Sequence, residues 1–138
     1  MGSASAASVI LRCPKIKVRQ EQEQEQERIT RADLERLELR VGRIVGVEGF
    51  PEARKPAYKL LIDFGPLGLK SSSARITRLY SKEELLNRRV IAVTNLPPKR
   101  IAGFSSEALV LGVVLRDGAV VLLEPEGEPP PGASVRAA

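Results

Sequence analysis

The chain has 138 residues, which is enough for one domain with a hydrophobic core and too few for two. It carries 22 Lys and Arg against 17 Asp and Glu, and the net charge of +5 suits a polyanionic partner or plain solubility equally well. With no histidine and one cysteine, Cys13, it cannot assemble a Ser-His-Asp or Cys-His catalytic site, a Cys/His zinc site or an internal disulfide. We therefore expect no enzymatic activity, no metal and no cofactor.

The first 28 residues differ in composition from the rest of the chain. Residues 1–20 carry basic but no acidic side chains, and residues 21–27 alternate Glu and Gln with no apolar side chain to bury. We expect residues 1–28 to be a disordered, low-complexity extension. It is either a basic tail that aids RNA binding or an extended gene start without a role, and we favour the second. No apolar stretch approaches the ~20 residues of a membrane span, so we expect no membrane insertion. The single cysteine fits a reducing compartment, and we expect a cytoplasmic protein.

Residues 29–138 form the predicted domain. A short helix begins at Thr30, which has the hydroxyl-to-carboxylate spacing of an N-terminal cap. A strand follows over residues 39–47, in which two glycines indicate strong bending. After a loop over residues 50–56, a second strand over residues 58–64 places its apolar even-numbered residues on one face.

The second half of the domain continues with short strands. A third strand is predicted over residues 67–72, a capped helical segment begins at Ser81, and strands follow at residues 89–95, 108–115 and 119–124. The order strand, strand, strand, helix, strand, strand is that of the OB-fold. We therefore predict an all-β, five-stranded Greek-key barrel with short helices and extra terminal strands. Such a fold does not by itself settle function.

The segment between the fourth and fifth strands, residues 95–107, is the most informative one. Two prolines stiffen the backbone directly before two cations, and small polar residues come next. We interpret it as a rigid cationic loop that grips a phosphate-bearing ligand. The alternative is a long hairpin whose prolines and glycine only shape it. The candidate contacts are Asn95, Lys99, Arg100, Ser105 and Ser106.

Two further segments carry suitable side chains. Residues 70–78 hold three consecutive serines that can present hydroxyls and backbone amides to an anion, whereas plain helix capping would account for one of them. Residues 54–59 form a cationic loop leading into a strand, and a solvated charged loop is the alternative there. The candidate contacts in the serine segment are Lys70, Ser72, Ser73, Arg75 and Arg78.

Aromatic residues and long apolar runs limit the mode of binding and the assembly. Two tyrosines, three phenylalanines and no tryptophan do not supply rows of base-stacking rings, so the basic surface suits folded RNA better than single strands. Residues 108–115 and 120–123 are continuously apolar, which is typical of strands covered on both faces. Either a partner subunit or the domain's own helices would cover them.

Four ordered motifs span most of the predicted domain. They are residues 37–44 (LELRVGRI), 51–65 (PEARKPAYKLLIDFG), 72–77 (SSARIT) and 95–111 (NLPPKRIAGFSSEALVL). Together, over about residues 30–135, they resemble the tRNA-binding domain family, and most closely its stand-alone branch, the CsaA export-related chaperones.

The resemblance implies an OB-fold homodimer that binds tRNA by its structure without catalysis, as does the C-terminal appendage of many bacterial methionyl-tRNA synthetases. For the CsaA branch it also implies chaperone activity on exported or unfolded polypeptides. Two departures from the family pattern are Glu38, where Asp is usual, and Ser71 with Arg75, where glutamines are common. We conclude from the sequence that the chain is a non-catalytic, homodimeric tRNA-binding protein. The alternative is a chaperone that binds polypeptides in a hydrophobic groove near the dimer interface.

Overall fold

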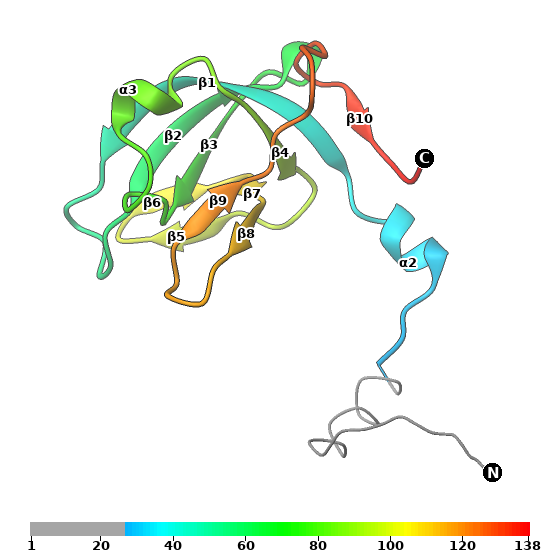
Figure 1. Ribbon diagram of the computed structural model, residues 1–138, viewed down its shortest axis with the longest axis horizontal. Helices are drawn as coiled ribbons and strands as arrows, with labels where there is room; N and C mark the ends of the chain where they lie inside the picture. Colours follow the sequence, from blue (N-terminus) through cyan, green and yellow to red (C-terminus); the bar gives the residue numbers. More distant parts are fainter. Residues whose placement is uncertain (1–26) are drawn as a thin grey trace. The chain divides into compact units, whose positions relative to one another are not determined.

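The computed structural model describes residues 27–138 (Figure 1). The extension predicted over residues 1–28 therefore lies almost wholly outside the described residues, as does Cys13. The described residues divide into two units, residues 27–34 and residues 35–138. Among residues 27–138, no helix is long and apolar enough to cross a membrane.

A reciprocal cap opens the helix α2 (Arg31–Glu35) in the first unit. The N–H of Thr30 donates to Asp33 Oδ2 at 3.1 Å, and the N–H of Asp33 donates to Thr30 Oγ1 at 3.1 Å. The predicted start of this helix is confirmed, because the amides of Thr30 and Asp33 each find the other residue's side chain as acceptor.

The long strand β1 (Leu39–Gly49) organises the second unit. It pairs antiparallel with β2 (Tyr58–Asp63) on one side and with β4 (Arg89–Val93) on the other, as Figure 1 shows. The ladder with β2 shifts register between Ile44 and Gly46, so the strand bends there, as its glycines indicate. A Cβ on Gly42 would lie 2.5 Å from the side chain of Ile62 and 2.7 Å from that of Phe64, so glycine leaves the space in which these two core side chains pack on β1.

The sheet curls into a nearly closed barrel. Its strand order is β3-β2-β1-β4-β7, with β3 spanning Leu69–Ala74 and β7 spanning Leu109–Val110. The two ends meet where the N–H groups of Glu107 and Ala108 donate to the carbonyl of Ser71 at 2.8 and 3.2 Å. This all-β architecture confirms the predicted OB-fold.

The core lies inside this barrel and matches the predicted alternation. Leu60, Ile62 and Phe64 are buried, whereas Leu61 between them is 41% exposed. The helix α3 (Lys82–Leu85) begins with the predicted capping box at Ser81 and closes one end of the core with the fully buried Leu85. The third strand starts two residues later than predicted because the 3-10 turn η1 (Gly65–Leu67) comes first.

Two segments differ from the predicted structure, namely the loop over residues 95–107 and the strand over residues 108–115. Residues 95–107 contain a hairpin, β5 (Lys99–Ile101) and β6 (Phe104–Ser106), which turns at Ala102 and Gly103 with positive φ. These residues thus have the shape of a hairpin, which was the alternative to a rigid loop. The predicted strand 108–115 is broken after β7, because the chain leaves β4 and continues as β8 (Gly112–Val114), paired with β9 (Val120–Leu122).

The C-terminal tail returns to β1. The N–H of Gly132 donates to the carbonyl of Val41 at 2.7 Å, and the N–H of Val41 donates to the carbonyl of Ala133 at 2.9 Å. The short strand β10 (Ser134–Val135) then pairs with the beginning of β1.

Candidate nucleic-acid interface

The cationic hairpin, residues 99–106, presents its charges to solvent. Lys99 pairs with Ser106 and Arg100 with Ser105 across the ladder, so the two cations lie on opposite faces of β5. Both cationic side chains are exposed, and the Arg100 guanidinium donates to the carbonyl of Gly103 at 3.3 Å across the turn. Each charge is therefore available to a phosphate.

The base of the hairpin is bonded to the serine segment of β3. The hydroxyl of Ser71 donates to the carbonyl of Ser105 at 2.6 Å, and the N–H of Ser73 donates to the hydroxyl of Ser106 at 3.0 Å. The Glu107 carboxylate accepts both the N–H and the hydroxyl of Ser71, at 3.0 and 3.2 Å. Two segments separated by more than 30 positions thus form one surface, and the carboxylate of Glu107 within it is bonded to Ser71.

The turn end of the hairpin contacts the third cationic segment through two aromatic rings. Phe104 packs edge-on against Phe50, with ring centroids 5.5 Å apart at an angle of 67°. The ammonium of Lys59 lies over both rings, 4.8 Å from the centroid of Phe50 and 5.3 Å from that of Phe104. We call this group the Phe-Lys-Phe stack. Our sequence analysis did not identify the two phenylalanines, because isolated rings 54 positions apart carry no local signal.

The outer face of β2 and β3 lies beside the stack and the hairpin base. Across this ladder Lys59 is opposite Ser73, Leu61 is opposite Ser71, and Asp63 is opposite Leu69. In OB-folds the face of strands 2 and 3, with the loops after strands 1 and 4, is where oligonucleotides bind. Here those loops are residues 50–57 and the region of the hairpin, and the Phe-Lys-Phe stack joins them.

The cations predicted in the serine segment are placed differently from one another. Arg75 follows β3 and is exposed, whereas Lys70 is half-buried opposite Ile62. The exposed Arg78 donates to the carbonyl of Asp117 at 2.5 Å and to its carboxylate at 3.3 Å, so it also fixes the turn between β8 and β9. Arg75 and Arg78 are therefore both exposed, and Arg78 is also bonded to Asp117.

Ser72 and Asn95 serve the fold. Ser72 is fully buried, and its hydroxyl donates to the carbonyl of Ala108 at 2.7 Å, which joins β3 to the start of β7. The amide of Asn95 accepts from the N–H of Glu38 at 2.9 Å and donates to the carbonyl of Arg36 at 2.8 Å. The alternation of β3 turns Ser72 inward and its two serine neighbours outward, which explains why a run of three serines has two roles.

Metal chemistry finds no support in the part of the chain that the structure describes. Residues 27–138 contain no group of three or more His, Cys, Asp or Glu side chains that could hold an ion. The surface offers cations, hydroxyls and backbone groups, which are suited to binding an anion.

The comparison with protein families agrees with this geometry. Residues 39–134 match the family described as "Putative tRNA binding domain", and these residues include the barrel and the hairpin. The chain belongs to the tRNA-binding domain family.

Similar proteins fall into two groups. Solved structures include the chaperone CsaA from Bacillus anthracis, 50% identical with a TM-score of 0.76 over 78% of this chain and 98% of that chain. The CsaA chaperone protein from Picrophilus torridus is 52% identical with a TM-score of 0.74, over 78% and 99% of the two chains. The methionine–tRNA ligase of Pyrococcus abyssi is 37% identical over 133 residues, which are 94% of this chain and 18% of the ligase. The chain therefore spans less than a fifth of the curated ligase.

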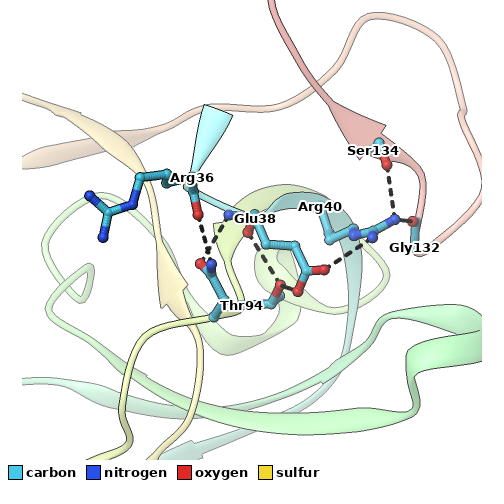
Figure 2. A network of polar contacts seen from close by, with 7 residues as sticks. Arg36, Glu38, Arg40, Thr94, Gly132 and Ser134 are labelled. Carbon is cyan, nitrogen blue, oxygen red and sulfur yellow. Dashed lines mark hydrogen bonds and ion pairs between the residues drawn. The ribbon is translucent and has the colours of Figure 1, made fainter. Parts of the chain in front are cut away.

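A polar network fixes the beginning of this tRNA-binding domain, as Figure 2 shows. Thr94 donates to the Glu38 carboxylate at 2.7 Å, and Arg40 donates to it at 3.1 Å. Arg40 also donates to the carbonyl of Gly132 at 3.0 Å and to the hydroxyl of Ser134 at 2.9 Å. The network ties the start of β1 to the end of β4 and to the C-terminal tail, so Glu38 has a structural role.

The pKa of Glu38 lies below its ordinary value of 4.5, first because Thr94 donates to the carboxylate and then because Arg40 does. A lowered pKa means that ionised Glu38 stabilises the fold above pH 4.5 and that this contribution is lost as the pH falls through the folded pKa. Glu38→Gln should therefore be less stable than the parent near pH 6, by less than about 1 kcal/mol because the ion pair is partly exposed. The difference should shrink towards about pH 3.

Urea unfolding of the parent and Glu38→Gln at both pH values measures this effect. Thr94→Val keeps the carboxylate and removes its strongest donor, so it should also weaken the dependence on pH. A stability difference between the parent and Glu38→Gln that stays constant with pH would show that the network does not act through ionisation.

Proposed function

We propose that this protein binds tRNA or tRNA-like RNA and catalyses no reaction. The observation that carries the proposal is the meeting of three cationic segments at one edge of the barrel. Residues 99–106 bond to β3 through Ser71 and Ser73, and they contact the loop after β1 through the Phe-Lys-Phe stack. The proposed contacts are Lys70, Ser73, Arg75, Arg78, Lys99, Arg100, Ser105 and Ser106; Ser72 and Asn95 are left out because their polar atoms serve the fold.

The mechanism in this proposal has two steps. Exposed Arg and Lys side chains first attract the phosphate backbone, and the release of counterions makes the affinity depend on salt. The rigid hairpin and the outer face of β2 and β3 then select an RNA of matching shape, since the chain has few aromatic rings on which unpaired bases could stack. A tRNA partner also implies that the protein works in the cytoplasm.

The assembly in this proposal is a homodimer. Val113 and Val121 face each other across the β8–β9 ladder and remain 49% and 38% exposed, and Leu115 and Leu123 nearby are 42% and 39% exposed. Of the two ways in which this apolar surface could be covered, burial by the domain's own helices therefore does not occur, since these side chains remain exposed. A second copy of the chain would cover it.

A second candidate function is binding of unfolded or exported polypeptides. It is favoured by the two similar structures that are named chaperones and are matched over nearly their whole length. In this proposal the polypeptide lies in a hydrophobic groove near the dimer interface. The two functions do not exclude each other, because one uses cations and the other uses apolar surface.

One titration separates the candidates. The purified chain is titrated with tRNA and with a permanently denatured protein, each at about 50 and about 200 mM salt. With about four phosphate contacts, the affinity for tRNA should fall roughly a hundredfold between the two salt concentrations. Binding to apolar segments should persist at high salt. No binding of tRNA at the lower salt concentration would refute the proposed function.

A further inference from the structure

The cationic hairpin is held in place by contacts outside its own ladder. β5 and β6 pair only with each other, and a two-stranded hairpin is marginally stable in water. Its base is bonded to β3 through Ser71, Ser73 and Ser106. Those bonds involve residues of β6. Among the hydrogen bonds described for residues 27–138, none joins the turn at Ala102 and Gly103 to the barrel. The position of the turn therefore depends on the side chain of Phe104, which is next to it.

Phe104 is held by a buried ring and a cation. Phe50 is only 4% exposed, so it offers a fixed surface at the end of β1. Lys59 is half-buried in β2, and its ammonium is within 5.3 Å of the centroids of both rings. A cation within about 6 Å of a ring centroid is attracted to the ring face, and one that contacts two rings draws both towards itself. The stack thus connects two neighbouring elements, the end of β1 and the start of β2, to β6, which lies far from both in the sequence.

We infer that Lys59 is a positioning residue of the RNA interface: its ammonium holds Phe104 against Phe50 and so fixes the orientation of Lys99 and Arg100. This inference rests on the proposed function, since it concerns how that surface is arranged. Lys59 belongs to the cationic segment 54–59, but its charge is directed to the rings, unlike those of the exposed Arg54 and Lys55. It acts on RNA through the hairpin and does not itself bind a phosphate.

Phe104→Leu tests this role without changing any charge. It removes the ring and keeps an apolar side chain, so the stack is lost while every cation remains. If the hairpin then moves freely, the contacts of Lys99 and Arg100 are lost, and the slope of log affinity against log salt should fall by about 1.4 to 1.8. The amides of residues 99–106 should also exchange hydrogen faster in the RNA-free full chain, while those of β1 and β2 keep their protection.

Lys59 variants and a matched lysine complete the experiment. Lys59→Met should reproduce the effects of Phe104→Leu, and adding it to Phe104→Leu should change little, because both remove the same stack. Lys59→Arg should keep the parental salt slope, because a guanidinium also binds ring faces. Lys55→Met, the same chemical change in the same segment, removes an exposed charge that does not lie over the two rings. It should leave the exchange of residues 99–106 at the parental rate, and any change in affinity should add to that of Phe104→Leu.

The outcomes are distinguishable. A parental salt slope and parental exchange of residues 99–106 in Phe104→Leu would overturn the inference. So would a Lys59→Met effect that adds fully to that of Phe104→Leu, because this would make Lys59 a direct phosphate contact. If Phe104→Leu does not fold, Lys59→Met gives the same two measurements. If the parent binds no tRNA, the proposed function fails, and hydrogen exchange alone still decides whether the stack holds the hairpin.

Discussion

Reversing both charges of the cationic hairpin, Lys99→Glu with Arg100→Glu, should abolish most of the affinity for tRNA. Both side chains are exposed, and their positions on opposite faces of β5 let them reach two different phosphates. A hydrogen bond to a charged group contributes about 1.5 kcal/mol or more, so losing two corresponds to roughly a hundredfold weaker binding. The salt slope should fall as well, because about two fewer counterions are released.

Filter binding or fluorescence anisotropy with tRNA over a series of salt concentrations measures both quantities. The matched control is Arg116→Glu with Arg136→Glu, which changes the net charge equally at two exposed arginines outside the three cationic segments. The control should lose much less affinity, since it alters the overall field but no proposed contact. Unchanged affinity and salt slope in the hairpin variant would remove the hairpin from the interface.

Val113→Asp should separate the proposed homodimer into monomers. Val113 is 49% exposed on the outer face of the β8–β9 hairpin, so an aspartate there is solvated in a monomer and buried in a dimer. A two-fold interface contains each substitution twice. At about 2 kcal/mol for each central residue, the dimer should dissociate roughly a thousandfold more readily.

Sedimentation equilibrium of the full chain measures this change, and thermal unfolding checks that the fold is kept. Leu86→Asp is the control, because Leu86 is 45% exposed and follows α3, outside the β8–β9 hairpin. The control should sediment like the parent. A parent that is monomeric at all concentrations would refute the homodimer, and a dimeric Val113→Asp would place the interface elsewhere.

Local sequence patterns predicted the elements that depend on neighbours a few positions apart. The alternation of residues 58–64 correctly assigned Leu60, Ile62 and Phe64 to the core, because side chains of a strand point to opposite faces in turn. The capping box at Ser81 was also correct, since its two hydrogen bonds join residues only three positions apart.

The same patterns misread one element. The uniformly apolar residues 108–115 predict one continuous strand, yet the chain changes partner from β4 to β9 after Leu111. A uniformly apolar run does not specify which strand pairs with it. The change of partner after Leu111 therefore could not be predicted from the composition or the hydrophobic periodicity of this segment. The exposure of Val113 and Val121 results from this change of partner.

The three serines and the hairpin show a second limit of prediction from local sequence patterns. Ser71, Ser72 and Ser73 are equivalent in sequence, and only the pairing of Ser72 with Leu60 turns its side chain into the barrel. Likewise, residues 95–107 were identified as a cationic connection, and the choice between loop and hairpin depended on the ladder that Lys99 forms with Ser106.

The sequence by itself determined the order of the strands along the chain, the bend of the first strand and the positions of three cationic segments. Only the tertiary structure decided that these segments meet. Closure of the barrel brings β3 beside residues 105–108, and the packing of Phe104 on Phe50 around Lys59 joins the two loops. The contacts that the hairpin makes with β3 and with the Phe50 ring join residues more than 30 positions apart, and such pairs arise from tertiary packing rather than from any local periodicity.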